Sequence, residues 1–284
     1  MSSYSWQPIE DLEENWADLR YQQLEVLINA WKQRVQQLQG SSVLKSFKDN
    51  LRREWLSKVD MLEYLYSTDR GTTQTILEQS IELSITTAMA PAKLAEISVP
   101  EYIRGLFSFV TQQRNLSVFY IKELHQVLTR NQPTTQAQDS FGNLLQIPLV
   151  HGQWKSRSNN PRRPDGTIHE YCPPEQVASE MENLVEMHNR HQKMGVSTEI
   201  EAAWLHHRFT QIHPFQDGNG RVARTLASLI FIRRGLFPVV ITQNDRQEYI
   251  LASEAADTGD LRHLINLFSR LQEKILIKGL GLPT

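Results

Sequence analysis

Cysteine is almost absent from this sequence, since Cys172 is the only one in 284 residues. An internal disulfide is therefore excluded, which suits a reducing compartment. Long apolar runs are missing too: the longest, LASLIFI at 226–232, is far too short to span a bilayer. The polar, acidic start of the chain argues against a signal peptide. Together these absences predict a cytoplasmic protein with no membrane segment.

An excess of charge of either sign is also absent. The 30 Lys and Arg residues are balanced by 32 Asp and Glu residues, a formal net charge of −2. General nucleic-acid binders usually carry a basic excess, so nucleic acid is not expected as a partner. Fixed repeats, heptads and low-complexity tails are missing as well, whereas apolar residues make up 40% of the chain. The sequence thus predicts one large domain or two modest ones with a real core.

Apolar residues recur at helical spacing through most of the chain. Ser117 is expected to be an N-cap, and helices are expected at 21–38, 43–66, 74–90, 118–128, 175–192, 198–212, 220–235 and 262–276. The segment 131–174 interrupts this pattern with Gln, Asn, Pro, Gly and Arg, which favour turns. Its extended pieces at 145–154 and 168–172 are expected to form a hairpin. The predicted fold class is therefore mostly α with a small β-hairpin.

One loop carries charged and flexible residues that packing alone does not require. It lies in QIHPFQDGNGRVARTL, residues 211–226, between two helices with apolar stripes. Glycine and asparagine in DGNG tolerate positive φ, and a turn that ends at a helix start aims backbone N–H groups at one point. Arg221 and Arg224 share a face of the second helix, and their guanidinium groups suit phosphate oxygens.

The other polar residues of this loop indicate a reaction. Asp217 among these cationic groups is explained by a bridging Mg²⁺, because the carboxylate alone would repel phosphate. His213, earlier in the loop, is a base that is partly neutral at physiological pH. Each piece alone is more often structural: a turn, a buried ring, solvent-facing arginines. Their occurrence together points to phosphoryl or nucleotidyl transfer.

The stretch HPFQDGNGRVAR at 213–224 resembles the signature of the Fic family, His-x-Phe-x-Asp/Glu-Gly-Asn-Gly-Arg-x-x-Arg, at every fixed position. The segments SVFYIKELHQVL, GQWK and 245–268 resemble further parts of the family's core. This resemblance covers about residues 115–270 and implies a Fic-type helical bundle with a small β-hairpin flap. The implied division is a helical N-terminal region, 1–112, followed by a core with flap and C-terminal helices, 113–284.

The resemblance implies transfer of AMP from ATP, with Mg²⁺, to a Ser, Thr or Tyr hydroxyl of a target protein. It makes His213 the general base, Phe215 the anchor of the loop and Asp217 the metal ligand. The nucleotide-binding positions that it implies are Asp217, Gly218, Asn219, Gly220, Arg221 and Arg224, with Tyr249 and Asp257 on the adenosine side. The flap would hold a target segment by strand pairing, and its residues are Ile168, His169, Glu170, Tyr171 and Cys172.

Many Fic proteins carry an inhibitory helix, Ser/Thr-x-x-x-Glu-Gly/Asn, whose glutamate pairs with the second arginine of the signature. QTILEQ at 74–79 is the best match, which makes Glu78 the inhibitory residue of a helix at about 72–90. Gln74 and Gln79 depart from the pattern, and SRLQEK with Glu273 is a second candidate. The prediction is an autoinhibited AMP-transferase. A hydrolase that removes AMP and a non-catalytic helical interaction protein are the alternatives, and self-modification and homo-oligomer formation stay open.

Overall fold

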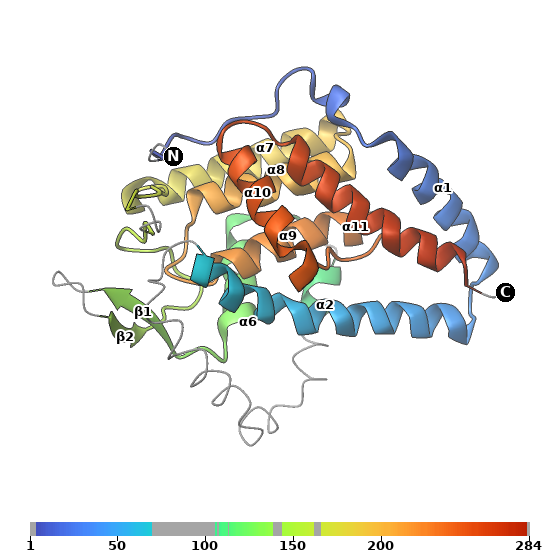
Figure 1. The fold of residues 1–284 in the computed structure, drawn as a ribbon, viewed down its shortest axis with the longest axis horizontal. Helices are drawn as coiled ribbons and strands as arrows, with labels where there is room; N and C mark the ends of the chain where they lie inside the picture. The colour runs from blue at the N-terminus through green and yellow to red at the C-terminus, as the bar shows by residue number, and fades with distance from the viewer. Residues whose placement is uncertain are drawn as a thin grey trace.

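The computed structural model describes residues 4–69, 106, 108–112, 114–138, 144–161 and 166–282, with side chains described outside 56–69, 138, 144 and 145. Over these residues the chain is mostly helical and contains one small antiparallel sheet (Figure 1). The helix expected at 74–90 lies outside the described residues, and so does Glu78.

The long helices follow the apolar periodicity of the sequence. Ser117 caps α6 as expected, since its side chain accepts a hydrogen bond from the backbone N–H of Tyr120 at 3.1 Å. The elements are 3-10 turns at Trp16–Leu19, Pro174–Gln176 and Gln243–Asp245, and the helices α1 (Gln22–Gln37), α2 (Ser42–Asp69), α6 (Val118–Thr129), α7 (Val177–Met194), α8 (Thr198–Ile212), α9 (Asn219–Arg233), α10 (Arg246–Asp257) and α11 (Arg262–Leu280). Helix α10 was not expected, because Ala252, Ser253 and Ala256 on its buried face are small and give little hydrophobic contrast.

The hairpin is built from other segments than those expected. Strand β1 (Thr134–Gln138) pairs antiparallel with β2 (Leu144–Pro148). The expectation that 145–154 pairs with 168–172 is therefore wrong: the partner of β2 is the strand just before it in the chain, and antiparallel strands are readily joined by short connections. The flap segment instead meets the start of the chain, where Tyr4 and His169 form a parallel bridge.

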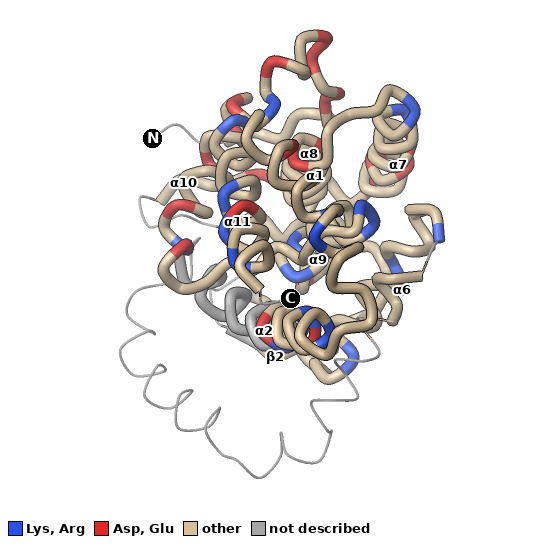
Figure 2. Tube along the Cα trace, turned by 90° about the vertical axis from the view of Figure 1, so that its right-hand side faces the viewer, with Lys and Arg blue, Asp and Glu red and all other residues tan. Residues whose placement is uncertain are grey.

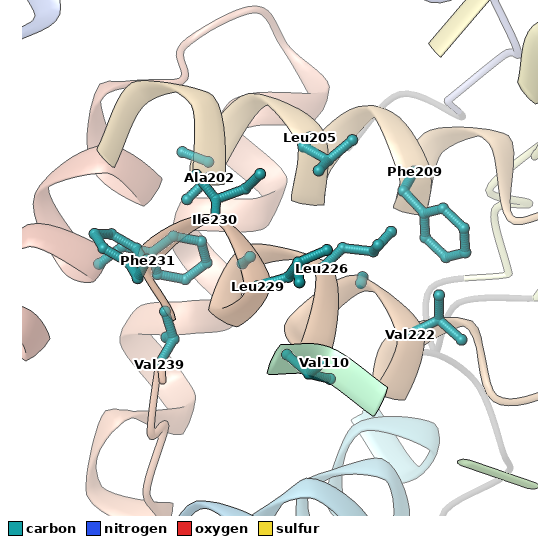
Figure 3. Packing of buried hydrophobic residues seen from close by; sticks show 14 of the residues in the cluster. Val110, Ala202, Leu205, Phe209, Val222, Leu226, Leu229, Ile230, Phe231 and Val239 are labelled. Carbon is teal, nitrogen blue, oxygen red and sulfur yellow. The ribbon is translucent and has the colours of Figure 1, made fainter. Parts of the chain in front are cut away.

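Helices α8 and α9 form the centre of the molecule, and α9 is buried from Asn219 to Phe231. Figure 3 shows apolar side chains of α8 pointing at those of α9, in the order Ala202, Leu205 and Phe209 on one helix and Ile230, Leu226 and Val222 on the other. Helices α7 and α11 pack on α8, whereas α2 and α6 pack on α9 (Figure 1). The buried residues of α1 and α2 belong to the same hydrophobic cluster as those of 113–284. The division at residue 112 stays a prediction.

The start of the chain runs along the outside of α7 and α8 before α1 begins (Figure 1). The indole of Trp204 and the guanidinium of Arg208 both donate to the carbonyl oxygen of Glu10, at 3.1 and 3.0 Å. The backbone N–H of Ile9 donates to the carboxylate of Glu180 at 2.9 Å. These bonds hold residues 9 and 10 against both helices.

A buried ionic network also holds this segment. Glu201 of α8 accepts from Nδ1 of His188 at 2.6 Å and from Nδ1 of His191 at 2.7 Å, and Nε2 of His191 donates to Asp11 at 2.5 Å. Ionised carboxylates only accept hydrogen bonds, so His191 is protonated on both nitrogens. Although burial opposes its charge, the bonds to Glu201 and Asp11 raise the pKa of His191. Burial likewise opposes the charge of Glu201, yet the two histidines lower its pKa.

Charged residues of both signs are spread along the chain. In Figure 2, Lys and Arg positions and Asp and Glu positions both occur in many parts of the trace, and the whole sequence has a net charge of −2. Within the described parts of the chain, none of the helices combines the length and apolar character needed to cross a bilayer.

We expect Glu201→Gln to lower the free energy of unfolding by about 3 kcal/mol, because the buried imidazolium of His191 then loses its buried counter-charge and keeps only the partly exposed Asp11. Glutamine also offers one acceptor oxygen to two N–H donors. Urea denaturation measures the change. The matched control is Glu186→Gln, an exposed carboxylate on α7, which should change stability by less than about 0.5 kcal/mol. Equal effects of the two substitutions would contradict the network.

Candidate functional site

His213 ends α8 with its backbone in the left-handed region, at φ 51° and ψ 56°. Of all non-glycine residues that the structure describes, only His213 has a positive φ. This conformation costs about 1–2 kcal/mol for a residue with a Cβ. The N–H of His213 closes the helix on the carbonyl oxygen of Phe209 at 3.0 Å, so the chain turns sharply into the loop at this residue.

The imidazole of His213 is held in one orientation and one tautomer. Its Nδ1 lies 3.3 Å from the carbonyl oxygen of Thr210. A carbonyl can only accept, so Nδ1 carries the proton and Nε2 of the neutral ring carries the lone pair. The ring of Tyr171 stacks on it, with 3.7 Å between centroids and 8° between planes. His213 can therefore act as a base through Nε2.

The middle of the loop is pinned by a reciprocal pair. The backbone N–H of Phe215 donates to Oδ1 of Asn219, and Nδ2 of Asn219 donates to the carbonyl oxygen of Phe215, each at 2.8 Å. Asn159 donates to the same carbonyl, also at 2.8 Å. The ring of Phe215 is fully buried. The side chain of Asn219 therefore folds the loop, and its contribution to an anion site would come from its backbone N–H.

His125 of α6 supports the loop from the core, and the sequence pattern did not single it out. The backbone N–H of Gly152 donates to its Nδ1 at 2.8 Å, so the proton is on Nε2, which donates to the carbonyl oxygen of Asp217 at 3.0 Å. Its ring stacks on Phe215, with 3.9 Å between centroids. Burial lowers the pKa of His125 to about 4 and keeps it neutral. Its place on the apolar stripe after Leu124 was a usable signal, because buried polar groups are normally hydrogen-bonded.

The carboxylate of Asp217 is oriented by two further residues outside the predicted set, Gln132 and Thr135. Oδ2 accepts from Nε2 of Gln132 at 2.6 Å and from Oγ1 of Thr135 at 2.8 Å, while Oδ1 accepts from the N–H of Gly218 at 2.6 Å. A carboxylate has about four acceptor positions, so one is left for a cation. Mg²⁺ typically takes one or two carboxylates and completes its shell with water and phosphate, which this environment fits. Clusters of three or more metal-binding side chains do not occur among the described residues.

Gln132 joins Asp217 to the first arginine of α9. Its Oε1 accepts from Nη2 of Arg221, whose Nη1 donates to the carbonyl oxygen of Leu128 at 3.4 Å. Arg221 and Arg224 are 8% and 3% exposed. Buried guanidinium groups stay charged and require acceptors or anions around them. The two arginines thus bring positive charge to the buried side of α9.

Gly218, with φ 79°, stands at the N-cap of α9. A Cβ at this position would lie 2.9 Å from Cγ2 of Thr129, so the loop needs glycine for close approach to α6 as well as for its backbone conformation. The N–H groups of the first turn of α9 have no acceptor within the helix, and together with the helix dipole they suit an anion. The loop therefore brings together a histidine that could act as a base, a carboxylate with room for a cation and a helix start suited to an anion.

Tyr249 and Asp257 lie on α10, and each is paired with a histidine of α8. Tyr249 is 1% exposed, and its hydroxyl lies 2.7 Å from Nε2 of His206. Oδ1 of Asp257 lies 3.1 Å from Nε2 of His207. These contacts tie α10 to α8, and the assignment of both residues to the adenosine side of a nucleotide stays a prediction.

The flap residues differ in what they contact. Tyr171 covers His213, whereas His169 is 1% exposed and Ile168 is 41% exposed. Burial raises the pKa of the Cys172 thiol to about 12, which keeps it protonated and poorly nucleophilic. The structure thus brings Tyr171 to the predicted base.

The part of the chain that carries the loop is similar to known proteins. Residues 115–231 match the model of the Fic/DOC family. The chain is 33% identical over 108 residues to protein adenylyltransferase fic-1 of Caenorhabditis briggsae, covering 38% of this chain and 21% of that protein. It is 42% identical over 89 residues to a Fido domain-containing protein of Dictyostelium discoideum, covering 31% of this chain and 62% of that protein. The alignments thus span about a fifth of the length of the nematode adenylyltransferases.

The fold is similar to solved structures over most of the chain. A Fic domain-containing signaling protein from Bacteroides thetaiotaomicron matches with a TM-score of 0.63 and 25% identity, covering 90% of this chain and 93% of that chain. Fic-1 from Caenorhabditis elegans matches with a TM-score of 0.60 and 19% identity, covering 93% of this chain and 74% of that chain. Because the identity to Fic-1 is only 19%, this second match shows a similar fold and nothing more.

We expect His125→Phe to reduce the acid sensitivity of the fold. The folded-state pKa of about 4 lies below the ordinary 6.5, so the unfolded chain binds a proton first and stability is lost as the pH falls from 6.5 towards 4. Phenylalanine keeps the stacking but cannot titrate, and it leaves the Asp217 carbonyl and the Gly152 N–H unpaired.

Urea denaturation at two pH values measures this effect. Between pH 7 and pH 5 the wild type should lose about 2 kcal/mol more than His125→Phe, which at pH 7 should already be about 2–4 kcal/mol less stable. His263→Phe is the control, since this histidine has a side chain 65% exposed. A parallel loss in the wild type and His125→Phe would remove His125 from this role.

Proposed function

We propose, from the Fic/DOC family domain that this chain carries at residues 115–231, that it transfers AMP from ATP to a Ser, Thr or Tyr hydroxyl of a target protein. The observation that carries the proposal is the arrangement of one short loop. A histidine with its lone pair on Nε2 stands at one end, and a carboxylate with an acceptor position for a cation stands beside a helix start at the other. Relatives named protein adenylyltransferase over this part of the chain support the same chemistry.

The triphosphate of ATP binds at the start of α9. The N–H groups of Asn219 and Gly220 and the dipole of the helix stabilise its anionic oxygens. Mg²⁺ on the remaining acceptor position of Asp217 would neutralise charge on the α- and β-phosphates. Gln132 connects this carboxylate to Arg221, which sets the guanidinium near the outer phosphates. Arg224 is assigned to the γ-phosphate.

His213 removes the proton from the target hydroxyl. The hydroxyl oxygen then bonds to the α-phosphorus, the bond from that phosphorus to the oxygen bridging to the β-phosphate breaks, and pyrophosphate leaves. The carbonyl of Thr210 selects the tautomer, and the stacked ring of Tyr171 sets the plane of the imidazole. Because both constraints exist before substrate binds, the lone pair needs no reorientation at the moment of transfer.

Glu78 is the proposed inhibitory residue, pairing with Arg224 and keeping it from the γ-phosphate. This assignment rests on the sequence resemblance, since Glu78 lies outside the described residues. The second candidate, Glu273, accepts a hydrogen bond from the hydroxyl of Tyr21 at 2.9 Å and so ties α11 to the start of α1. That contact favours a structural role for Glu273. We place the reaction in the cytoplasm, which the single buried thiol suits.

We expect His213→Ala to lower AMP transfer by about 10²–10⁴-fold, because a positioned general base is lost. The assay uses labelled ATP with Mg²⁺ and measures self-modification, so the target protein need not be known. Both proteins are measured in the Glu78→Gly background, so that inhibition does not mask the difference. Binding of a non-hydrolysable ATP analogue should change by less than about twofold, since the imidazole acts on the hydroxyl. His263→Ala serves as the control, and equal rates of the Glu78→Gly protein with and without His213→Ala would exclude His213 as the base.

Asp217→Asn and Arg221→Ala should impair transfer for different reasons. The first removes the charge that binds the cation, so the Mg²⁺ concentration for half-maximal rate should rise about tenfold or more. The second removes an outer-phosphate contact, so the ATP concentration for half-maximal rate should rise instead. Separate titrations of Mg²⁺ and ATP distinguish them, with the exposed Arg234→Ala as control. An unchanged Mg²⁺ profile in Asp217→Asn contradicts the metal assignment.

A further inference from the structure

We propose that the edge of the flap at 168–170 is a strand-docking surface whose resident partner is this chain's own N-terminal segment, residues 4–12. An extended segment of a target protein has to displace it before transfer. The docking of residues 4–12 stands on the structure alone, whereas competition with a target rests on the proposed function.

Main-chain pairing places the N-terminal segment on the flap. Tyr4 and His169 form a parallel bridge, and the backbone N–H of Glu170 donates to the carbonyl oxygen of Tyr4 at 2.9 Å. The rings of Tyr4 and His169 stack, with 4.5 Å between centroids and 11° between planes. The indole of Trp6 donates to Oε1 of Gln176 at 3.2 Å, just beyond the flap. The segment thus engages the flap by the backbone mode that an added strand uses.

The bridge lies next to the predicted base along the chain. Tyr171 follows Glu170, and its ring stacks on His213. A strand that docks beside residues 168–170 therefore lies at the approach to the site of transfer. The N–H of Glu170 can serve only one strand at this edge, so residues 4–12 and a target segment compete for it.

The N-terminal segment is held more firmly at residues 9–11 than at residues 4–7, so residues 4–7 can open on their own. Ile9 is 6% exposed, and Asp11 pairs with the buried His191. Tyr4 and Trp6 are only half-buried, and the carbonyl oxygen of Gln7 accepts a bond from Gln211 at 3.1 Å. Residues 4–7 can therefore open while 9–11 remain attached, because local opening starts where few buried contacts are lost. A segment tethered in this way competes at a high effective concentration.

Hydrogen exchange tests the docking without any reliance on catalysis. Peptides that cover 166–172 are compared by mass spectrometry in the full chain, in a chain lacking residues 1–7, and in Tyr4→Ala. Exchange of the Glu170 amide should be about tenfold faster without residues 1–7, because the carbonyl oxygen of Tyr4 that accepts its hydrogen bond is lost. Exchange should also be faster in Tyr4→Ala, because the segment that carries this carbonyl is held less firmly without the tyrosine ring. Ser5→Ala, at an exposed neighbour, is the matched control. Equal protection with and without residues 1–7 overturns the docking.

AMP transfer tests the competition. Self-modification is counted at sites beyond residue 12, so that the deletion removes no counted acceptor. The chain lacking residues 1–7 should react several-fold faster, and a free peptide of residues 1–12 at about 1 mM should slow it again while affinity for the ATP analogue stays the same. If exchange changes but neither the deletion nor the peptide alters the rate, competition is wrong. If no form of the protein transfers AMP, the proposed function fails, and the exchange result still decides the docking.

Discussion

The packing of α8 against α9 is the constraint on which the candidate site depends. Both helices are buried along almost their whole length, and their apolar faces meet in the middle of the molecule. A short loop joins them, so the positions of its residues follow from the core and not from the loop's own preferences. His213 and Gly218, both in the left-handed region, are the points where the chain leaves one helix and enters the other. A shift of either helix would separate His213 from the start of α9.

The polar side chains around the loop have two different tasks. Asn219 and His125 form hydrogen bonds to loop backbone and hold its shape. His213 and Asp217 are only half-buried and carry the groups suited to chemistry. Gln132 contributes to both tasks, because its side chain is hydrogen-bonded to the carboxylate of Asp217 and to the guanidinium of Arg221. The geometry of the site is thus kept by neutral, hydrogen-bonded groups, and a neutral side chain links its carboxylate to its guanidinium group.

Periodicity predicts most of the helices, and one uninterrupted motif predicts the loop. Both signals are local in sequence, and the structure contains most of the predicted helices and a loop between α8 and α9 at the motif. Apart from helix α10, whose hydrophobic pattern is weak, what the sequence did not reveal depends on segments that meet only in the folded chain. Gln132 and Thr135 precede or lie in a polar strand, TTQAQ, that has no apolar alternation, and Tyr4 reaches the flap across more than half the chain. The wrong strand partner for β2 has the same cause, because pairing is a property of two segments and the pattern of one cannot select the other.

The left-handed backbone of His213 lowers the stability of the fold, whereas its side chain is the proposed base. Glycine would adopt φ 51° without steric strain, and asparagine with less strain than histidine. Selection for a more stable fold alone would therefore favour replacement of the side chain that is proposed as the base. A library of variants sorted only by heat resistance should therefore enrich glycine or asparagine at this position. On the proposed function, histidine at this position supplies a lone pair that glycine or asparagine would not, at the cost of a strained backbone.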